Sequence, residues 1–204
     1  MRKFKLFLDF EKEARWLNEM ASEGYELVGT SFGYRFRKSK PDNANIKIDY
    51  RLFKKQADFV DYCTLFEDSG WEHLAGTKSS GAQYFKKVSN DADEDIFSDI
   101  DSKAGRYKRL SQMYLSLAMC YLPIFAALVT TNAIDASAFI NPKQLYFTPG
   151  LWDKAGADFW GAFLFETPFA FFRGFAWLAF PIMIALCLIF SYKAEQRYQK
   201  IKKT

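Results

Sequence analysis

The sequence WLNEMASEGYELVGT, residues 16–30, is nearly repeated as YCTLFEDSGWEHLAGT, residues 62–77. The shift is 46 positions, so that Trp16 corresponds to Tyr62. At this shift Gly24 falls on Gly70, and after a one-residue insertion the two Gly-Thr pairs coincide. Two further pairs of segments also correspond: KFKLF (3–7) with DYRLF (49–53), and YRFRK (34–38) with QYFKK (83–87). The sequence therefore contains two copies of one structural unit.

Each copy predicts the same order of secondary structure. Alternating apolar residues in KFKLFLDF (3–10) and IKIDYRLF (46–53) indicate strands with one buried face. Apolar residues at three-to-four spacing predict amphipathic helices over 10–23 and 57–69, and Gly24 and Gly70 stand where a helix C-cap favours a left-handed residue. Two short strands follow each glycine: YELVGT and YRFRK in the first copy, EHLAGT and QYFKK in the second. The unit is β-α-β-β.

One such unit has too few strands to cover its own hydrophobic faces, because isolated small sheets are marginally stable in water. Two copies can place both helices on one face of a shared sheet and so enclose a single core. We therefore expect residues 1–88 to form a duplicated α+β domain, a ferredoxin-like two-layer sandwich, in the cytoplasm.

Aromatic residues at repeated positions are the candidates for a ligand or partner site on this domain. They are Trp16, Tyr25, Tyr50, Tyr62 and Trp71. Such residues line either a groove between the two halves or the exposed face of the sheet. The alternative is that they form the hydrophobic core, which is the commoner role of aromatic residues at these positions.

The sequence carries no pattern typical of catalysis. His73 is the single histidine, and Cys63, Cys120 and Cys187 are scattered without a CxxC pair, so neither a metal site nor a nucleophile with its base is predicted. Phosphate-binding and hydrolase motifs are lacking as well. We expect a protein that is not an enzyme and has no cofactor. The net charge of +4 averages opposed local charges and does not predict nucleic-acid binding.

The second half of the chain predicts a membrane hairpin. An acidic stretch, 89–102, reads as a linker, and residues 103–204 follow with two uncharged runs, 110–131 and 174–192. At 1.5 Å per residue each run is long enough to cross a hydrocarbon core of about 30 Å. Lys and Arg residues lie before the first run and after the second, while few lie between them, which predicts a two-pass protein of the inner membrane with both termini in the cytoplasm.

The segment between the spans, 132–173, is rich in aromatic residues. Four of them are the candidates for contact with the membrane interface: Trp152, Phe159, Trp160 and Phe163. Aromatic rings concentrate at the headgroup boundary, so we expect a short interfacial helix over roughly 151–166. The alternative is a face that binds a partner protein.

The residues DFEKEARWLNEMASEGYELV, GYRFRK, KIDYR and FEDSGWEHL, together with YFKK, carry a family resemblance over about residues 1–88. The chain resembles an uncharacterised bacterial domain family of unknown function that is commonly encoded beside PadR-type transcriptional regulators. The resemblance implies an attached hydrophobic region and expression controlled by such a regulator, and it assigns no catalytic residue.

Two functions remain open from the sequence. The first is a non-enzymatic accessory or regulatory protein, whose cytoplasmic domain binds a protein or an apolar ligand. Its hairpin would dock in the bilayer with a membrane partner such as a transporter or an envelope-stress complex. The second is a self-oligomer that acts in self-protection or transport; intramembrane polar residues would favour it, and the two runs contain few.

Overall fold

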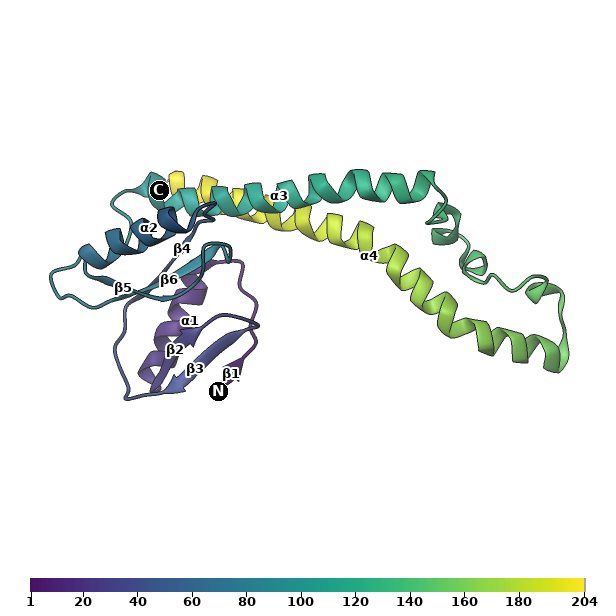
Figure 1. The fold of residues 1–204 in the computed structure, drawn as a ribbon, viewed down its shortest axis with the longest axis horizontal. Helices are drawn as coiled ribbons and strands as arrows, with labels where there is room; N and C mark the ends of the chain where they lie inside the picture. The colour runs from purple at the N-terminus through teal and green to yellow at the C-terminus, as the bar shows by residue number, and fades with distance from the viewer. Residues whose placement is uncertain (204) are drawn as a thin grey trace. The chain divides into compact units, whose positions relative to one another are not determined.

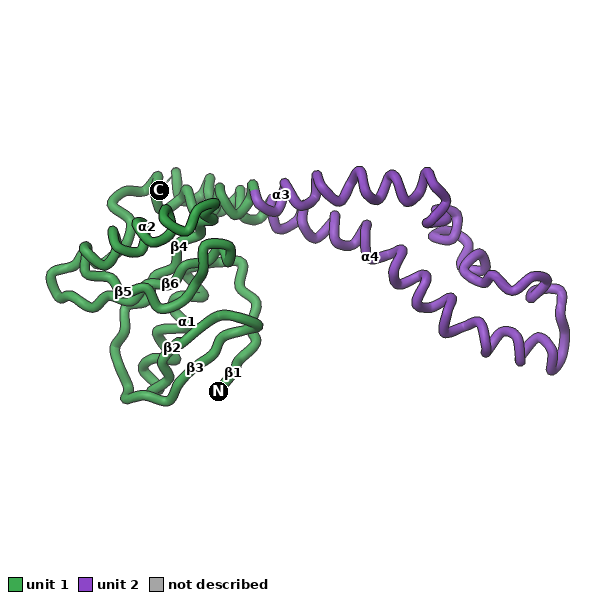
Figure 2. The backbone as a smooth tube through the Cα atoms, viewed as in Figure 1, with its two compact units in different colours: residues 1–112, 192–204 green, residues 113–191 purple. Residues whose placement is uncertain are grey.

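The computed structural model describes residues 1–203 (Figure 1). The chain divides into two compact units. Unit 1 contains residues 1–112 and 192–204, and unit 2 contains residues 113–191 (Figure 2). The elements of unit 1 are β1 (Arg2–Lys3), α1 (Phe10–Ser22), β2 (Tyr25–Gly29), β3 (Tyr34–Lys38), β4 (Ile46–Tyr50), α2 (Gln56–Asp68), β5 (Trp71–Ala75) and β6 (Ala82–Lys87). Two long helices, α3 (Ile100–Thr130) and α4 (Gly156–Lys202), contribute to both units.

The two short helices form where the apolar spacing predicts them. Asp9 caps α1, because its side chain accepts a hydrogen bond from the Glu11 amide at 3.0 Å. The buried face of α1 comes from residues spaced three and four apart, and Gly24 follows the helix with a φ of 83°. Gly70 has the same role after α2, with a φ of 81°. Both glycines occupy the left-handed region that other residues avoid.

The strands form two antiparallel sheets of three strands each, in the order β1-β3-β2 and β4-β6-β5. The α+β class is therefore confirmed, but the expected shared sheet is replaced by two sheets. The register shifts between Leu27 and Gly29 in β2 and between His73 and Ala75 in β5. A bulge increases local twist. Although β2 and β5 approach each other, the two bulged strands form no common ladder.

The first strand is shorter than the alternation in KFKLFLDF predicts. Its ladder with β3 contains Arg2 and Lys3, and Lys3 lies opposite Tyr34, where β3 begins. Beyond Lys3 no strand lies opposite the chain to accept its backbone hydrogen bonds. Residues 4–9 therefore form a loop, although their apolar pattern resembles that of a half-buried strand.

Helix α1 packs against β2 of its own sheet and against β4 of the other, while α2 packs against β5. Asn18 of α1 accepts a hydrogen bond from the Ile46 amide at 2.8 Å, which satisfies a donor at the start of β4. A core cluster joins α2 to the second sheet through Tyr62, Trp71 and Phe85. The two halves thus share a core through α1, without sharing a sheet.

The acidic stretch 89–102 does not form a free linker. Ala92 and Ile96 pack against the core cluster of the second sheet, and Asp95 pairs with Lys103 at 2.6 Å. The apolar residues between the acids explain the difference, because they bury surface that a solvated linker would leave exposed. The domain continues through this stretch and into the first turns of α3.

Unit 2 contains residues 113–130 of α3, residues 156–191 of α4 and the segment that connects them. Tyr114 contacts Phe190 and Phe125 contacts Phe180, so the helices run antiparallel within this unit. The connection contains three 3-10 helices, Ala136–Phe139, Pro142–Leu145 and Leu151–Asp153. A cluster of Ile134, Ala138 and Trp177 packs this connection onto α4.

Helix α4 begins at Gly156 and continues for 47 residues, so the expected short helix over 151–166 is not a separate element. At 1.5 Å per residue it is about 70 Å long, roughly twice the thickness of a hydrocarbon core. Both α3 and α4 are long and apolar enough to cross a membrane.

Candidate functional site

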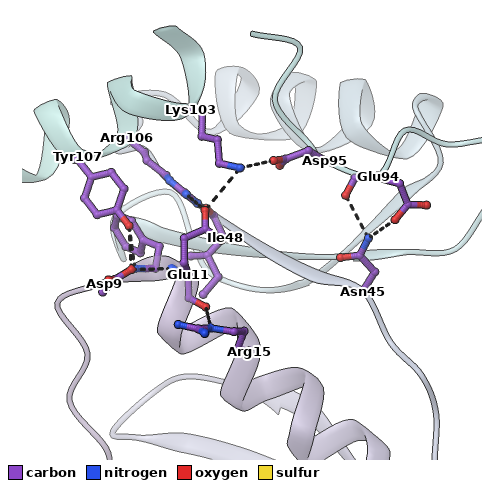
Figure 3. A network of polar contacts seen from close by, with 11 residues as sticks. Asp9, Glu11, Arg15, Asn45, Ile48, Glu94, Asp95, Lys103, Arg106 and Tyr107 are labelled. Carbon is purple, nitrogen blue, oxygen red and sulfur yellow. Dashed lines mark hydrogen bonds and ion pairs between the residues drawn. The ribbon is translucent and has the colours of Figure 1, made fainter. Parts of the chain in front are cut away.

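A polar network joins the first turns of α3 to the α+β domain, and this network is the candidate functional site (Figure 3). Its centre is Arg106, whose side chain is only 2% exposed. One of its terminal nitrogens donates to the Ile48 carbonyl of β4 at 2.6 Å, and the other donates to Glu11 of α1 at 2.5 Å. A single guanidinium thus binds α3 to one helix and one strand of the domain.

The surroundings of Arg106 are aromatic. Its guanidinium lies 4.9 Å from the ring centroid of Phe97, 5.3 Å from that of Phe10 and 5.2 Å from that of Tyr107. Rings at such distances attract a cation through their quadrupoles, which compensates part of the lost hydration. The Nε atom of Arg106 is buried and has no hydrogen-bond partner among the described residues.

One turn later, Arg109 binds the next two residues of β4. It donates to the Tyr50 carbonyl at 2.5 Å and to the Asp49 carboxylate at 2.7 Å. The Asp49 carboxylate is 4% exposed and also accepts a hydrogen bond from the Tyr62 hydroxyl of α2 at 2.8 Å. Burial and the negative charge of Asp49 raise the pKa of Tyr62, so this phenol stays protonated and remains a donor.

Between the two arginines, Tyr107 contacts the beginning of α1. Its hydroxyl lies 3.2 Å from Asp9 Oδ1 and accepts a hydrogen bond from the Phe10 amide at 3.2 Å. Asp9 also pairs with Arg197 of α4 at 2.9 Å. The cap of α1 therefore contacts both long helices within unit 1. Burial is the main cause that raises the pKa of Tyr107.

A second buried carboxylate lies between the two sheets. Glu13 of α1 is 5% exposed, and one of its oxygens accepts hydrogen bonds from Tyr34 of β3 at 2.7 Å and from Tyr84 of β6 at 2.6 Å. Burial raises the pKa of Glu13, and the two phenol donors oppose this shift. Because Tyr34 and Tyr84 belong to different sheets, Glu13 is a polar connection between the two halves.

The five aromatic residues singled out from the sequence lie in different environments. Tyr62 and Trp71 belong to the core cluster of the second sheet, and Tyr50 is buried with its ring stacked on Phe10. Trp16 is half-buried against Tyr34 and Phe36. Tyr25 lines a cavity between the halves, of about 120 Å³, with Leu27 and Ile46.

The four aromatic residues expected at the membrane interface lie together in unit 2. The ring centroids of Phe159 and Phe163 are 5.5 Å apart, and Trp152 lies 6.1 Å from Phe159. Trp160 contacts both phenylalanines and remains largely exposed. They form one aromatic cluster around the first turns of α4, which either lipid or a protein partner could contact.

His73 contacts Gln83 through Nε2 at 3.1 Å and packs edge-on against Phe59 and Phe85. Burial lowers the pKa of this histidine. Within residues 1–203, no three side chains of His, Cys, Asp or Glu lie close enough to hold a metal ion.

Sequence reasoning missed the network of Arg106 and Arg109. It treated them as basic residues at the cytoplasmic end of a span, whereas both bind the domain. One signal was present. Arg106 and Arg109 are three residues apart, on one helical face, and the predicted strand at 46–50 contains an acidic residue, Asp49, between two apolar residues.

The fold and the network define an α+β domain built onto the beginning of α3 and the end of α4, two membrane-capable helices. A family model described as "protein of unknown function (DUF2812)" matches residues 9–119, more than half of the chain, and the chain belongs to that family. The match extends past residue 88 into α3, in agreement with the arginine contacts. The chain has no significant match among curated proteins or solved structures.

Proposed function

We propose that the protein is a membrane-anchored accessory protein without catalytic activity. Its α+β domain binds a protein or an apolar ligand in the cytoplasm, and α3 transmits this binding to a membrane partner such as a transporter. The single observation that supports the proposal is the attachment of Arg106 and Arg109 to three consecutive residues of β4, Ile48, Asp49 and Tyr50.

This attachment provides a physical route by which ligand binding to the α+β domain would move α3. β4 is also bonded to α1 through Asn18 and to α2 through Tyr62, so a ligand that repacks either helix displaces β4. A displaced β4 moves the helix that the two arginines hold, because each guanidinium is fixed by directional hydrogen bonds. The same helix continues into the uncharged run 110–131.

The proposed orientation has both termini in the cytoplasm. Lys193, Arg197, Lys200, Lys202 and Lys203 follow the second uncharged run, which supports this orientation. Cysteine labelling with a membrane-impermeant maleimide tests it. In a variant whose three native cysteines are replaced by serine, A136C should react in intact cells, and S22C should react only after permeabilisation. The reverse pattern would overturn the orientation.

The function is tested by purifying the tagged full-length protein from its native membranes in mild detergent. We expect a second membrane protein in fixed stoichiometry, and we expect its yield to fall severalfold when Arg106 and Arg109 are both changed to Gln. The matched control changes Arg15 and Arg37, two exposed arginines of the same unit, to Gln. A homogeneous self-oligomer with nothing else bound would instead favour self-protection or transport by this chain alone. Expression under a PadR-type regulator is a separate proposal, tested by transcription in a regulator deletion.

A further inference from the structure

Unit 1 exposes large apolar side chains that its own core does not cover. Phe4 is 73% exposed and Leu6 is 81% exposed in the loop between β1 and α1, and Phe32 is 85% exposed in the turn between β2 and β3. The two segments are adjacent, because a Cβ atom on Gly33 would lie 2.9 Å from the ring of Phe4. Together Phe4, Leu6 and Phe32 form an apolar surface, which we call the apolar loops.

Folding does not account for Phe32. Its φ is 52°, in the left-handed region that Gly and Asn occupy at low cost and bulky residues avoid. An aromatic residue there is conformationally unfavourable, and its exposed ring gains almost no burial in return. Such a residue indicates a contact outside the domain.

The apolar loops continue into a positively charged groove of about 650 Å³. One wall is formed by residues 6–9 with Lys12, and the other by Lys193, Gln196, Arg197 and Lys200 of α4. Asp9 is the single acid of the lining, and it pairs with Arg197 at 2.9 Å. Lys12, Lys193 and Lys200 are exposed. The groove therefore has an excess of positive charge beside apolar side chains.

The position of the groove along α4 indicates what it binds. Lys193 directly follows Tyr192, the last residue of the uncharged run 174–192. Lys200 lies about 10 Å further along the same helix at 1.5 Å per residue. The headgroup region of a bilayer extends roughly 5–8 Å beyond each side of the hydrocarbon core. A helix that crosses the membrane with this run places Lys193 at the headgroups.

We propose that this groove binds the headgroup of an anionic phospholipid, while Phe4, Leu6 and Phe32 enter the acyl-chain boundary. The inference rests on the proposed function, because it requires α4 to cross the membrane. Basic side chains near an anionic bilayer are attracted to its surface charge, and apolar side chains add the burial of their surface. A soluble phosphate compound would account for the lysines but would leave the apolar loops without a partner.

The test uses the full-length protein with Phe32→benzoylphenylalanine, reconstituted in nanodiscs that contain phosphatidylcholine and phosphatidylglycerol. After irradiation, intact mass spectrometry counts the covalent lipid adducts. We expect adducts at position 32, with phosphatidylglycerol enriched severalfold over its share of the bilayer. The control probe replaces Leu65 of α2, which is 64% exposed and remote in sequence from both loops, and it should give none.

Charge variants test the groove itself. Changing Lys12, Lys193 and Lys200 to Gln should bring the adduct ratio of the two lipids down to their ratio in the bilayer. Changing the exposed Lys38, Lys54 and Lys78 to Gln removes the same charge elsewhere in unit 1 and should leave the enrichment intact. Equal effects of the two triple variants, or no adduct at position 32, would overturn the inference.

The two proposals fail in different ways. If alkaline carbonate extracts the protein from its native membranes, α4 does not cross the bilayer and the proposed function fails with the inference. If the protein resists extraction but position 32 gives no lipid adduct, the inference alone fails.

Discussion

Arg106 donates to Glu11 at 2.5 Å, although the two residues are separated by 95 positions in the sequence. The contact brings the first turns of α3 onto the first turn of α1, so that nearly the whole domain lies between the two partners in the chain. A helix that leads into an apolar run is thus also a part of the domain core. The predictions below follow from this arrangement and from the buried carboxylates near it.

Arg106→Ala should lower the free energy of unfolding of the domain by about 2–4 kcal/mol, since it removes a buried charged donor and its packing against three rings. Glu11 is partly exposed, so its carboxylate regains water and the loss stays below that of a fully buried pair. Urea unfolding of the full-length protein in detergent, followed by near-ultraviolet circular dichroism, measures the change.

The control for this variant is Arg15→Ala, whose side chain is exposed and makes one long hydrogen bond of 3.4 Å. It should change the free energy by less than about 0.5 kcal/mol. A cycle with Glu11→Gln should give a coupling energy with Arg106 of about 0.5–3 kcal/mol. A coupling of zero would mean that the contact adds nothing to stability.

Arg109→Met should be more destabilising than Asp49→Asn. Removal of the arginine leaves the buried Asp49 carboxylate with only the Tyr62 hydroxyl as a side-chain donor, which costs about 3–5 kcal/mol. Asn in place of Asp keeps an acceptor for Tyr62 and introduces no charge. The double variant should recover part of the loss of Arg109→Met in thermal unfolding, and a strictly additive loss would contradict the coupling.

Glu13 should make stability depend on pH in the acidic range. Burial raises its pKa above the ordinary value of 4.5, so the folded protein binds this proton more tightly than the unfolded chain. The stabilisation from this proton is fully present below about pH 4.5 and is lost as pH rises through the folded pKa. The free energy of unfolding of the wild type, relative to that of Glu13→Gln, should therefore fall as pH rises from about 4.5 through the pKa of Glu13 in the folded protein. Glu19→Gln, on the exposed side of α1, is the control and should show no such trend.

His73 should give the opposite trend near neutrality. Burial lowers its pKa below 6.5, so the unfolded chain binds this proton more tightly than the folded protein. Stability from the neutral imidazole is present above pH 6.5 and is lost as pH falls through the folded pKa. His73→Gln keeps a donor for Gln83 and should remove this dependence from the unfolding midpoint. A midpoint that falls equally in both proteins would exclude His73 as the cause.

Phe32→Asn should stabilise the domain slightly in detergent, by about 0.5–1 kcal/mol, because Asn tolerates the left-handed conformation better than Phe. The thermal midpoint in detergent measures this gain. Phe59→Asn serves as the contrast, because Phe59 packs on Phe53 and His73 and should be destabilising when replaced. A loss of stability in Phe32→Asn would mean that the ring supports the fold.

Local patterns were sufficient to predict the two short helices. The apolar spacing and the glycines place them over 10–23 and 57–69, within one residue of α1 and α2. Helix propensity and capping determine where a helix begins and ends, and both depend on residues that are close in the sequence. The alternation over 3–10 was less informative, because it cannot show that the partner strand begins only at Tyr34.

Long-range contacts account for most of what the sequence did not predict. The bulges that keep β2 and β5 from a common ladder depend on packing between the halves. The roles of Arg106 and Arg109 depend on carboxylates that lie 95 and 60 positions away. A basic residue before an apolar run is ordinarily interpreted as a signal of membrane topology. Only the folded domain shows that the side chain of Arg106 is buried.

The location of the two arginines also fixes the order of events during synthesis. The domain remains without its buried ion pairs until residues 106 and 109 have left the ribosome, and the apolar run begins at residue 110. The nascent chain must therefore expose its first apolar run at almost the same moment as the domain acquires these two arginine contacts, while the contact of Asp9 with Arg197 forms only after α4 has been synthesised. Under the proposed function, membrane insertion of this run and formation of the arginine contacts are neighbouring steps, and a delay in the first leaves both an apolar helix and an unfinished domain exposed to solvent.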